Sequence, residues 1–285
     1  MRPASTRQTN TDNLHTSNTK MSSQFTFSIS KLKDRRVLVV GGSSGIGFGV
    51  AEALIANGAF VIISSSSYIR MSNAVKKLKD RYPTSRDRVQ AFVCDLSSPD
   101  TAESEVKRLF EQVAGGGKLD HVVYTAGDAM LIGNLEGFNL SQIHQAGMVR
   151  FFGPILVAKH LKTALKEGPA SSFTLTTGLA PKRPPKDFTI ISAYLAGLDG
   201  VVSGLARDLA PIRVNQVSLG AIDTELWDHI RQAGGFEQFR ADFEDRTLTK
   251  SMGNVEDVAE SYLYLMKDKN ATGSTVRTDG GLLLI

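Results

Sequence analysis

Short apolar segments alternate with longer amphipathic segments along most of the chain. From Lys31 onward, each short run of apolar and β-branched residues is followed by a stretch whose apolar positions recur with helical spacing. The predicted strands are Arg36–Val40, Phe60–Ser64, Val89–Cys94, His121–Tyr124, Ser172–Thr177, Arg213–Leu219 and Gly273–Arg277. The predicted helices include Ile46–Asn57, Thr101–Ala114, Leu140–Lys166, Leu195–Ala210 and Val255–Lys267. Such alternation is typical of βαβ units, in which helices cover a parallel sheet.

The alternating region, residues 31–285, contains neither an internal repeat nor a linker, so we expect one α/β domain. Its predicted fold is a doubly wound Rossmann-type domain with a mostly parallel sheet. Residues 1–30 are rich in Ser, Thr, Asn and Gln, and are expected to form a disordered extension. A transit peptide is the alternative for this extension, although it lacks an arginine-studded amphipathic face, and Met21 is an alternative start.

Composition narrows the classes of partner. The net charge of +4 is spread along the chain, and the basic patches at residues 31–36 and 181–186 lack interleaved aromatic residues, so nucleic acid is not an expected partner. Cys94 is the only cysteine, which excludes an intramolecular disulfide and favours a reducing, cytoplasmic location. No apolar run approaches the ~20 residues that cross a bilayer, so we expect no membrane partner.

A glycine-rich turn lies between the first predicted strand and the first predicted helix. In the sequence Gly41-Gly-Ser-Ser-Gly-Ile-Gly47, the glycines allow a sharp turn, a close approach of the backbone to a pyrophosphate and tight helix–strand packing. A glycine-rich turn without a ligand is the alternative, but the preceding strand and following helix argue against it. The predicted phosphate contacts are Gly41, Ser43, Ser44, Gly45, Ile46 and Gly47.

The end of the second predicted strand favours NADPH over NADH. An acidic residue there would bind a free ribose 2′-hydroxyl, but this chain has four serines, Ser64 to Ser67. Serine hydroxyls can donate to a 2′-phosphate, and Arg70 or Arg86 would supply positive charge. We therefore expect Ser64, Ser65 and Ser66 to bind the cofactor. The alternative is that these serines form an ordinary polar loop, which would leave the choice between NADPH and NADH open.

The chain resembles the short-chain dehydrogenase/reductase family from about Val37 to its C-terminus. The matching motifs are the glycine turn, Cys94-Asp-Leu96, Tyr124-Thr-Ala-Gly127, Phe151-Phe-Gly-Pro154, Leu209-Ala-Pro-Ile-Arg-Val-Asn215, Ser218-Leu-Gly-Ala-Ile-Asp-Thr224 and Asp279-Gly-Gly281. The resemblance implies that Asp95 and Leu96 flank the adenine, Ala126 and Gly127 the ribose, and Ile222 and Thr224 the nicotinamide amide. It also implies a small-molecule substrate and a homodimer or homotetramer built through the two long helices beside the active site.

The family's catalytic residues are largely missing. Members that reduce carbonyls use Asn, Ser and a Tyr-x-x-x-Lys pair, in which the lysine lowers the pKa of the tyrosine that protonates the alkoxide. Counting back from Pro211 places this pair at Ile191 and Leu195, and the register that uses Tyr194 puts Leu198 at the lysine position. The Asn position holds Arg150, and the Ser position holds Thr177.

A proline-stiffened segment follows the fifth predicted strand. Pro184 and Pro185 restrict its backbone and would hold Asp187 beside the nicotinamide. Hydride addition to an iminium cation neutralises a charge, so it needs a stabilising carboxylate rather than a proton relay. Asp187 is the predicted counter-ion, and the alternative is that it points to water. Arg150 would hold a substrate carbonyl or the cofactor ribose, and the alternative is that it forms a structural ion pair with a carboxylate in the core. Thr177 is the third predicted catalytic residue.

The same segment is similar to that of divergent fungal members of the family. Among these are bifunctional reductase/Diels–Alderases of prenylated indole alkaloid (malbrancheamide-type) pathways, which also lack the Tyr–Lys pair. The matching residues are Pro184, Pro185, Asp187 and Arg150, with slightly different spacing. The resemblance implies NADPH reduction of a cyclic C=N followed by stereoselective ring closure.

Residues 223–252 are predicted to form a substrate lid. Trp227, Phe236, Phe239 and Phe243 would suit an aromatic, nitrogen-containing ligand, although such spacing also serves helix packing. Pro184, Pro185, Tyr194 and Trp227 are the predicted substrate contacts.

Three function classes remain: an NADPH-dependent imine reductase with a coupled [4+2] cyclisation, a carbonyl reductase that uses Tyr194, and a cofactor-binding protein without activity. The histidines show no metal-ligand spacing, so no metal is expected.

Overall fold

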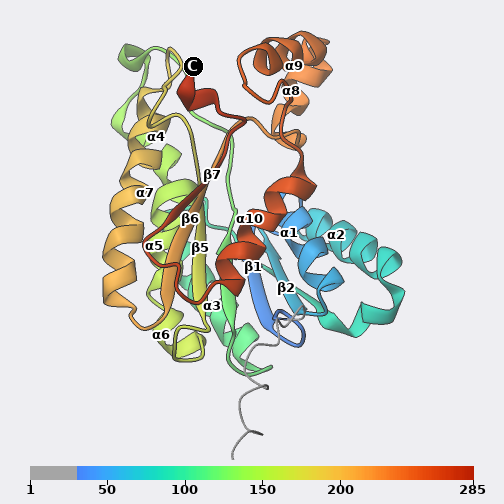
Figure 1. Ribbon diagram of the computed structural model, residues 1–285. Helices are drawn as coiled ribbons and strands as arrows, with labels where there is room; N and C mark the ends of the chain where they lie inside the picture. Colours follow the sequence, from blue (N-terminus) through green and yellow to red (C-terminus); the bar gives the residue numbers. More distant parts are fainter. Residues whose placement is uncertain (1–30) are drawn as a thin grey trace, which may run out of the picture. The chain divides into compact units, whose positions relative to one another are not determined.

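The computed structural model describes residues 31–285, and the predictions for residues 1–30 lie outside the described residues. Its seven strands form one parallel sheet in the order β3-β2-β1-β4-β5-β6-β7 (Figure 1). The strands are β1 Arg36–Val40, β2 Phe60–Ser65, β3 Val89–Val93, β4 His121–Tyr124, β5 Ser172–Gly178, β6 Arg213–Leu219 and β7 Thr275–Thr278. The predicted α/β fold class is confirmed. The strand order reverses between β1 and β4, and such a switch point opens a crevice at the carboxyl ends of the strands.

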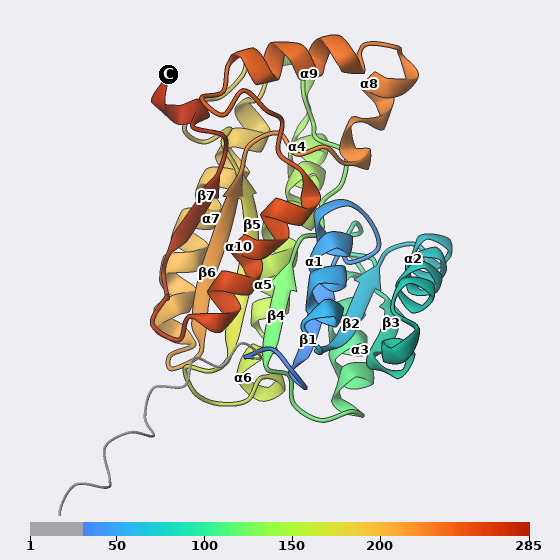
Figure 2. The same ribbon diagram turned by 45° about the vertical axis from the view of Figure 1, so that its right-hand side comes forward.

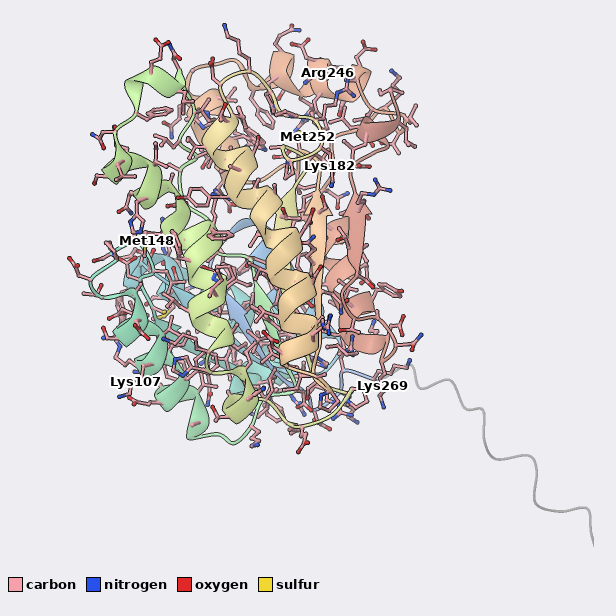
Figure 3. The ribbon with its side chains drawn as sticks, turned by 90° about the vertical axis from the view of Figure 1, so that its left-hand side faces the viewer. Lys107, Met148, Lys182, Arg246, Met252 and Lys269 are labelled. Atoms are coloured by element: carbon pink, nitrogen blue, oxygen red, sulfur yellow. The ribbon has the colours of Figure 1, made fainter. Side chains whose placement is uncertain are left out.

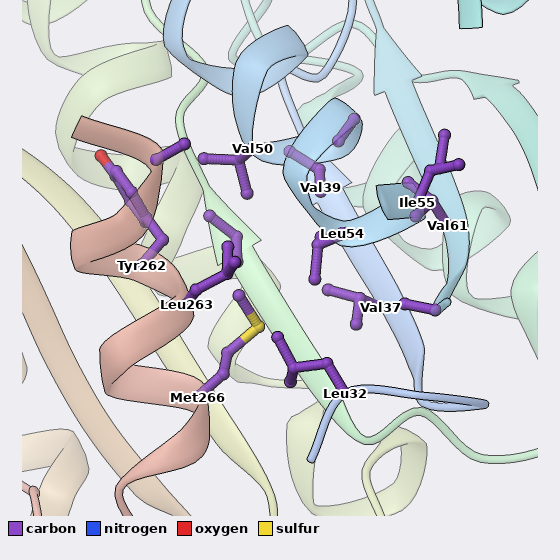
Figure 4. Close-up of a cluster of buried hydrophobic side chains, with 14 of the residues drawn as sticks. Leu32, Val37, Val39, Val50, Leu54, Ile55, Val61, Tyr262, Leu263 and Met266 are labelled. Atoms are coloured by element: carbon purple, nitrogen blue, oxygen red, sulfur yellow. The ribbon is translucent and has the colours of Figure 1, made fainter. Parts of the chain in front are cut away.

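Helices cover both faces of the sheet, which explains why its central strands are apolar on both sides. The helices α1 Gly45–Ala56, α2 Tyr68–Arg81 and α10 Val255–Lys267 cover one face. On that face, Leu54 of α1 and Tyr262 of α10 belong to the same buried cluster as Val39 of β1 (Figure 4). The other face is covered by α3 Ala102–Ala114, α5 Gly153–Ala158 and α7 Thr189–Asp208, which bury a second core cluster around Leu38.

The predicted long helix Leu140–Lys166 is wrong, because the chain is interrupted twice. It consists of α4 Leu140–Gly147, a π-helical turn η3 Met148–Phe152, α5 and a short helix α6 Leu161–Ala164. Pro154 explains the first interruption, since proline has no N–H to donate to an earlier carbonyl. Met148 lies at the start of this turn, on the side where α4, α5 and α7 run next to each other (Figure 3).

Helix α7 begins at Thr189, before the predicted start at Leu195. Among the described residues it is the one helix long and apolar enough to cross a membrane by length and composition, with a mean hydropathy of 1.4 in its most apolar window. This finding corrects the expectation that no segment reaches that length. However, Ile191, Leu198 and Val202 of α7 are buried against the domain, and core helices of globular domains pass the same test.

The segment 223–252 lies beyond the carboxyl ends of the strands (Figure 2). It contains a 3₁₀ turn, η4 Glu225–Trp227, and the helices α8 Asp228–Gln232 and α9 Phe236–Asp245. A backbone bridge between Ile222 and Gly253 joins the two ends of the segment. The remaining 3₁₀ turns are η1 Pro83–Arg88, η2 Leu135–Gly137 and η5 Leu282–Leu284.

Candidate active site

A cleft of about 1440 Å³ opens at the carboxyl ends of the strands, between the sheet and residues 223–252. It brings together every residue that the sequence predicts to bind the cofactor. These are Gly41, Ser43, Ser44, Gly45, Ile46, Gly47, Ser64, Ser65, Ser66, Asp95, Leu96, Ala126, Gly127, Ile222 and Thr224. Known ligand pockets measure about 300–1,000 Å³, so the cleft has room for a cofactor together with a substrate.

The glycine turn fits only residues without a side chain. Gly41 has a φ of +88°, and a Cβ added there would lie 2.5 Å from the backbone nitrogen of Ala126. A Cβ on Gly47 would lie 2.2 Å from the carbonyl oxygen of Gly41. The N-cap residue of α1, Ser44, makes no side-chain capping bond. The first N–H groups of α1 face the cleft without a side-chain cap from Ser44, and the N–H of Gly45 donates to the carboxylate of Glu225. An anion such as a nucleotide pyrophosphate would take the place of this carboxylate.

A serine and arginine cluster occupies the end of β2. Ser43 Oγ donates to Ser65 Oγ at 2.8 Å, and Arg70 Nη2 donates to Ser66 Oγ at 3.0 Å. Ser64 Oγ is buried and lacks a hydrogen-bond partner among the described residues, which leaves it available to a ligand. The hydroxyl groups and the nearby guanidinium are the donors that a 2′-phosphate needs, so the residues present fit a phosphorylated dinucleotide.

Of the two candidate arginines, only Arg70 lines the cleft. Arg86 instead lies 3.9 Å from the carboxylate of Asp80 and donates to the carbonyl of Lys79. Lys77 also lines the cleft, and sequence reasoning missed it. Its position two helical turns after Arg70 on α2 was the available signal.

The positions of the family's tyrosine and lysine hold apolar residues that line the cleft, Ile191 and Leu195. Thr177 also lines it, and its hydroxyl donates to the carbonyl of Leu195 at 3.3 Å. Tyr194 is not among the cleft-lining residues of the described chain; its hydroxyl donates to the carbonyl of Ile143 at 3.1 Å. The structure therefore does not bring the tyrosine hydroxyl to the position of a proton donor.

A half-buried ion pair lies in the cleft. Arg150 Nε is 3.4 Å from Asp128 Oδ1, and Arg150 Nη2 also donates to the carbonyl of Asp128. Burial lowers the pKa of Arg150 although Asp128 opposes the shift, and burial raises the pKa of Asp128 although Arg150 opposes it. Arg150 Nε and Asp128 Oδ1 lack a hydrogen-bond partner among the described residues. Both groups are therefore available to a polar ligand, and sequence reasoning had not singled out Asp128.

The proline segment lies at the cleft, but its aspartate does not. Pro184, Pro185 and Phe188 line the cleft, whereas Asp187 is exposed and is not among the lining residues. The φ of Asp187 is +67°, and its carbonyl accepts a hydrogen bond from Gly133 N at 3.1 Å. The structure therefore does not bring Asp187 into the cleft with Pro184 and Pro185.

Three of the four aromatic residues of the segment 223–252 line the cleft: Trp227, Phe239 and Phe243. The rings of Trp227 and Phe239 lie 4.7 Å apart, and Trp227 Nε1 donates to the carbonyl of Ile222 at 2.9 Å. Phe236 is buried outside the cleft lining, and Arg231 Cζ lies 3.7 Å from the centroid of its ring. The segment 223–252 therefore gives the cleft an aromatic wall, which suits a flat ligand.

A family model described as an SDR-like Rossmann domain matches residues 28–285. The short-chain dehydrogenase/reductase fsr5 of Gibberella fujikuroi is 52% identical over 90% of this chain and 97% of its own length. The short-chain dehydrogenase/reductase malC of Malbranchea aurantiaca is 37% identical over 89% of this chain and 96% of its own length.

Two solved structures extend the likeness to the fold. The MalC reductase/Diels–Alderase from Malbranchea aurantiaca has a TM-score of 0.85 and 36% identity, covering 90% of this chain and 99% of that chain. A small-chain dehydrogenase in complex with NADPH has a TM-score of 0.71 and 26% identity, covering 89% of this chain and 100% of that chain. The chain is an oxidoreductase that belongs to the short-chain dehydrogenase/reductase family.

Proposed function

We propose that this chain is an NADPH-dependent reductase of a cyclic imine or iminium in a fungal secondary-metabolite pathway that makes indole alkaloids. The observation that carries the proposal is the apolar pair Ile191 and Leu195, which lines the cleft where the family's tyrosine and lysine stand. A ketone needs a proton as it becomes an alkoxide, and this pair cannot supply one. An iminium already carries its charge and becomes a neutral amine on hydride addition.

NADPH is the proposed cofactor, and it supplies the hydride when bound. Arg70 and Ser66 form a donor pair at the end of β2, and Lys77 adds positive charge to the same wall of the cleft. A relative of known structure forms a complex with NADPH, which supports the same choice. The first N–H groups of α1 would hold the pyrophosphate.

The Arg150–Asp128 pair fits a substrate that carries both a cation and a carbonyl oxygen. Asp128 Oδ1 and Arg150 Nε are 3.4 Å apart and make no hydrogen bond. Oδ1 would therefore accept the cationic C=N group, and Nε would donate to the oxygen. The pair is half-buried, and its electrostatic effect on a substrate is larger there than at the surface. We therefore assign the counter-ion role to Asp128, while Asp187, the carboxylate predicted from the sequence, provides a matched comparison.

The test is anaerobic NADPH oxidation with matched cyclic iminium and ketone substrates. We expect the iminium to be reduced, the Asp128→Asn variant to lose most of this activity, and the Asp187→Asn and Tyr194→Phe variants to keep it. Loss in Asp187→Asn alone would return the counter-ion role to Asp187. Preference for the ketone, together with an inactive Tyr194→Phe variant, would show a carbonyl reductase and contradict the proposal.

We also propose that the cleft directs a [4+2] ring closure after reduction. The support is the likeness to the MalC reductase/Diels–Alderase and the aromatic wall formed by Trp227 and Phe239. A cleft that holds a diene and its partner in one orientation accelerates cycloaddition by proximity. Chiral chromatography should show one product enantiomer with the enzyme and a racemic mixture after chemical reduction of the same substrate. The same mixture in both reactions would limit the protein to reduction.

A further inference from the structure

Tyr124, the last residue of β4, lies behind the cleft rather than in it. It stands where the family usually has an asparagine, its side chain is only 3% exposed, and it is not among the cleft-lining residues of the described chain. Its hydroxyl donates a hydrogen bond to the carbonyl of Val149, inside the π turn η3. The proposed reaction does not use this hydroxyl directly.

The π turn leaves the Val149 carbonyl without its usual backbone donor. In an α-helix that carbonyl would accept from the N–H of Gly153, but this N–H donates to the carbonyl of Met148 instead. The next residue, Pro154, has no N–H to offer. A buried carbonyl needs a partner, so the Tyr124 hydroxyl replaces the missing backbone donor.

Gly153 makes room for this hydroxyl. A Cβ on Gly153 would lie 2.1 Å from the Tyr124 oxygen, so any larger residue would displace the tyrosine. The residue after Val149 in the same turn is Arg150, whose guanidinium packs against Gly127, where a Cβ would lie 2.8 Å from Nη1. The turn thus determines where the guanidinium meets Asp128.

We propose that Tyr124 is a positioning residue, which fixes the π turn and thereby holds the Arg150 guanidinium on Asp128 in the cleft. Burial keeps the Tyr124 hydroxyl protonated, because it raises the pKa well above its usual value. The hydroxyl therefore remains a donor across the working pH range. This inference rests on the proposed role of the Arg150–Asp128 pair in binding a dipolar substrate.

The first test is a double-mutant cycle on kcat/KM for the iminium substrate, with Tyr124→Phe and Arg150→Met. Tyr124→Phe should lower kcat/KM by about 10- to 100-fold, because small displacements of a positioning group are costly. Adding Tyr124→Phe to Arg150→Met should cause little further loss. The affinity for NADP⁺, measured by fluorescence titration, should stay within about twofold. Additive losses would overturn the inference.

Tyr262→Phe is the matched control. Tyr262 is also buried, and its hydroxyl forms a 2.7 Å hydrogen bond with Thr176 Oγ1 on the opposite face of the sheet. Its loss should lower the melting temperature about as much as Tyr124→Phe does, with kcat/KM within about threefold of wild type. Equal kinetic losses in both tyrosine variants would reduce the Tyr124 effect to general destabilisation and overturn the inference.

A crystal structure of Tyr124→Phe separates this inference from the proposed function. We expect the Arg150 guanidinium to move away from Asp128, whatever the substrate proves to be. If the wild-type protein reduces no iminium but the guanidinium moves, the proposed function fails and the positioning role stands. If the guanidinium stays on Asp128, the positioning role fails. Gly153→Ala provides a second route to the same displacement should Tyr124→Phe not fold.

Discussion

The carboxylate of Glu225 accepts a hydrogen bond from the backbone N–H of Gly45, with a distance of 2.9 Å between Oε2 and the nitrogen. Gly45 is the first residue of α1, and Glu225 belongs to η4 in the segment 223–252. An anionic side chain is therefore placed on the helix N-terminus where the cofactor's pyrophosphate is expected. This contact connects the proposed lid to the cofactor site.

Glu225→Gln should tighten NADP⁺ binding by about twofold to tenfold, because the cofactor no longer displaces a carboxylate from the helix N-terminus. Isothermal titration calorimetry at low salt would measure the change. Glu237→Gln is the control, since Glu237 is exposed on α9 and its nearest cation, Arg240, is 3.9 Å away. Weaker NADP⁺ binding in Glu225→Gln would mean that the carboxylate helps to hold the closed lid instead.

Arg70→Ala should weaken NADPH binding by about 10- to 100-fold through the loss of a charge-assisted contact to the 2′-phosphate. Its effect on NADH binding should be small, because NADH lacks that phosphate. Arg86→Ala is the matched control, as Arg86 lies outside the cleft lining and near Asp80. Fluorescence titration with NADPH and with NADH measures the ratio of the two dissociation constants. Equal losses of affinity for the two cofactors would contradict the role of Arg70 in binding the 2′-phosphate.

His121 should make folding stability depend on pH. Burial lowers its pKa from 6.5 to about 3, so the unfolded chain binds a proton before the folded protein does. The free energy of unfolding should therefore fall as the pH drops from 6.5 towards about 3, by up to about 1.4 kcal/mol per pH unit from this residue. Chemical denaturation measures the free energy of unfolding between about pH 4 and 7, across the range in which the unfolded histidine gains its proton. This free energy should depend less steeply on pH in His121→Gln than in the wild type. Parallel curves would contradict this assignment.

The predicted homo-oligomer can be tested at α7. The outer face of this helix exposes small residues, Ala193, Ala196 and Gly200, which let a second helix approach closely. Light scattering should give a multiple of the 30.8 kDa chain mass, and Ala196→Arg should shift the protein towards the monomer. Lys107→Ala on exposed α3 is the control. A wild-type monomer at micromolar concentration would contradict the prediction.

The alternation of apolar and amphipathic segments was enough to predict the α/β fold, because strand and helix periodicity are local properties of the chain. The bounds of β1, β4 and β6 agree with those predicted. The glycine turn was equally predictable, since Gly41 and Gly47 stand where added side chains would overlap backbone atoms. The replacement of the Tyr–Lys pair by Ile191 and Leu195 could also be counted directly along the sequence.

Contacts between distant residues determined the rest of the candidate site. The π turn needs both Pro154, which follows it closely in sequence, and the hydroxyl of Tyr124, which comes from the distant strand β4. Sequence reasoning placed Asp187 in the cleft, but Asp187 is exposed outside it, while Asp128 meets Arg150 there. Such pairings depend on how strands and helices pack in three dimensions, and sequence spacing alone does not contain that information.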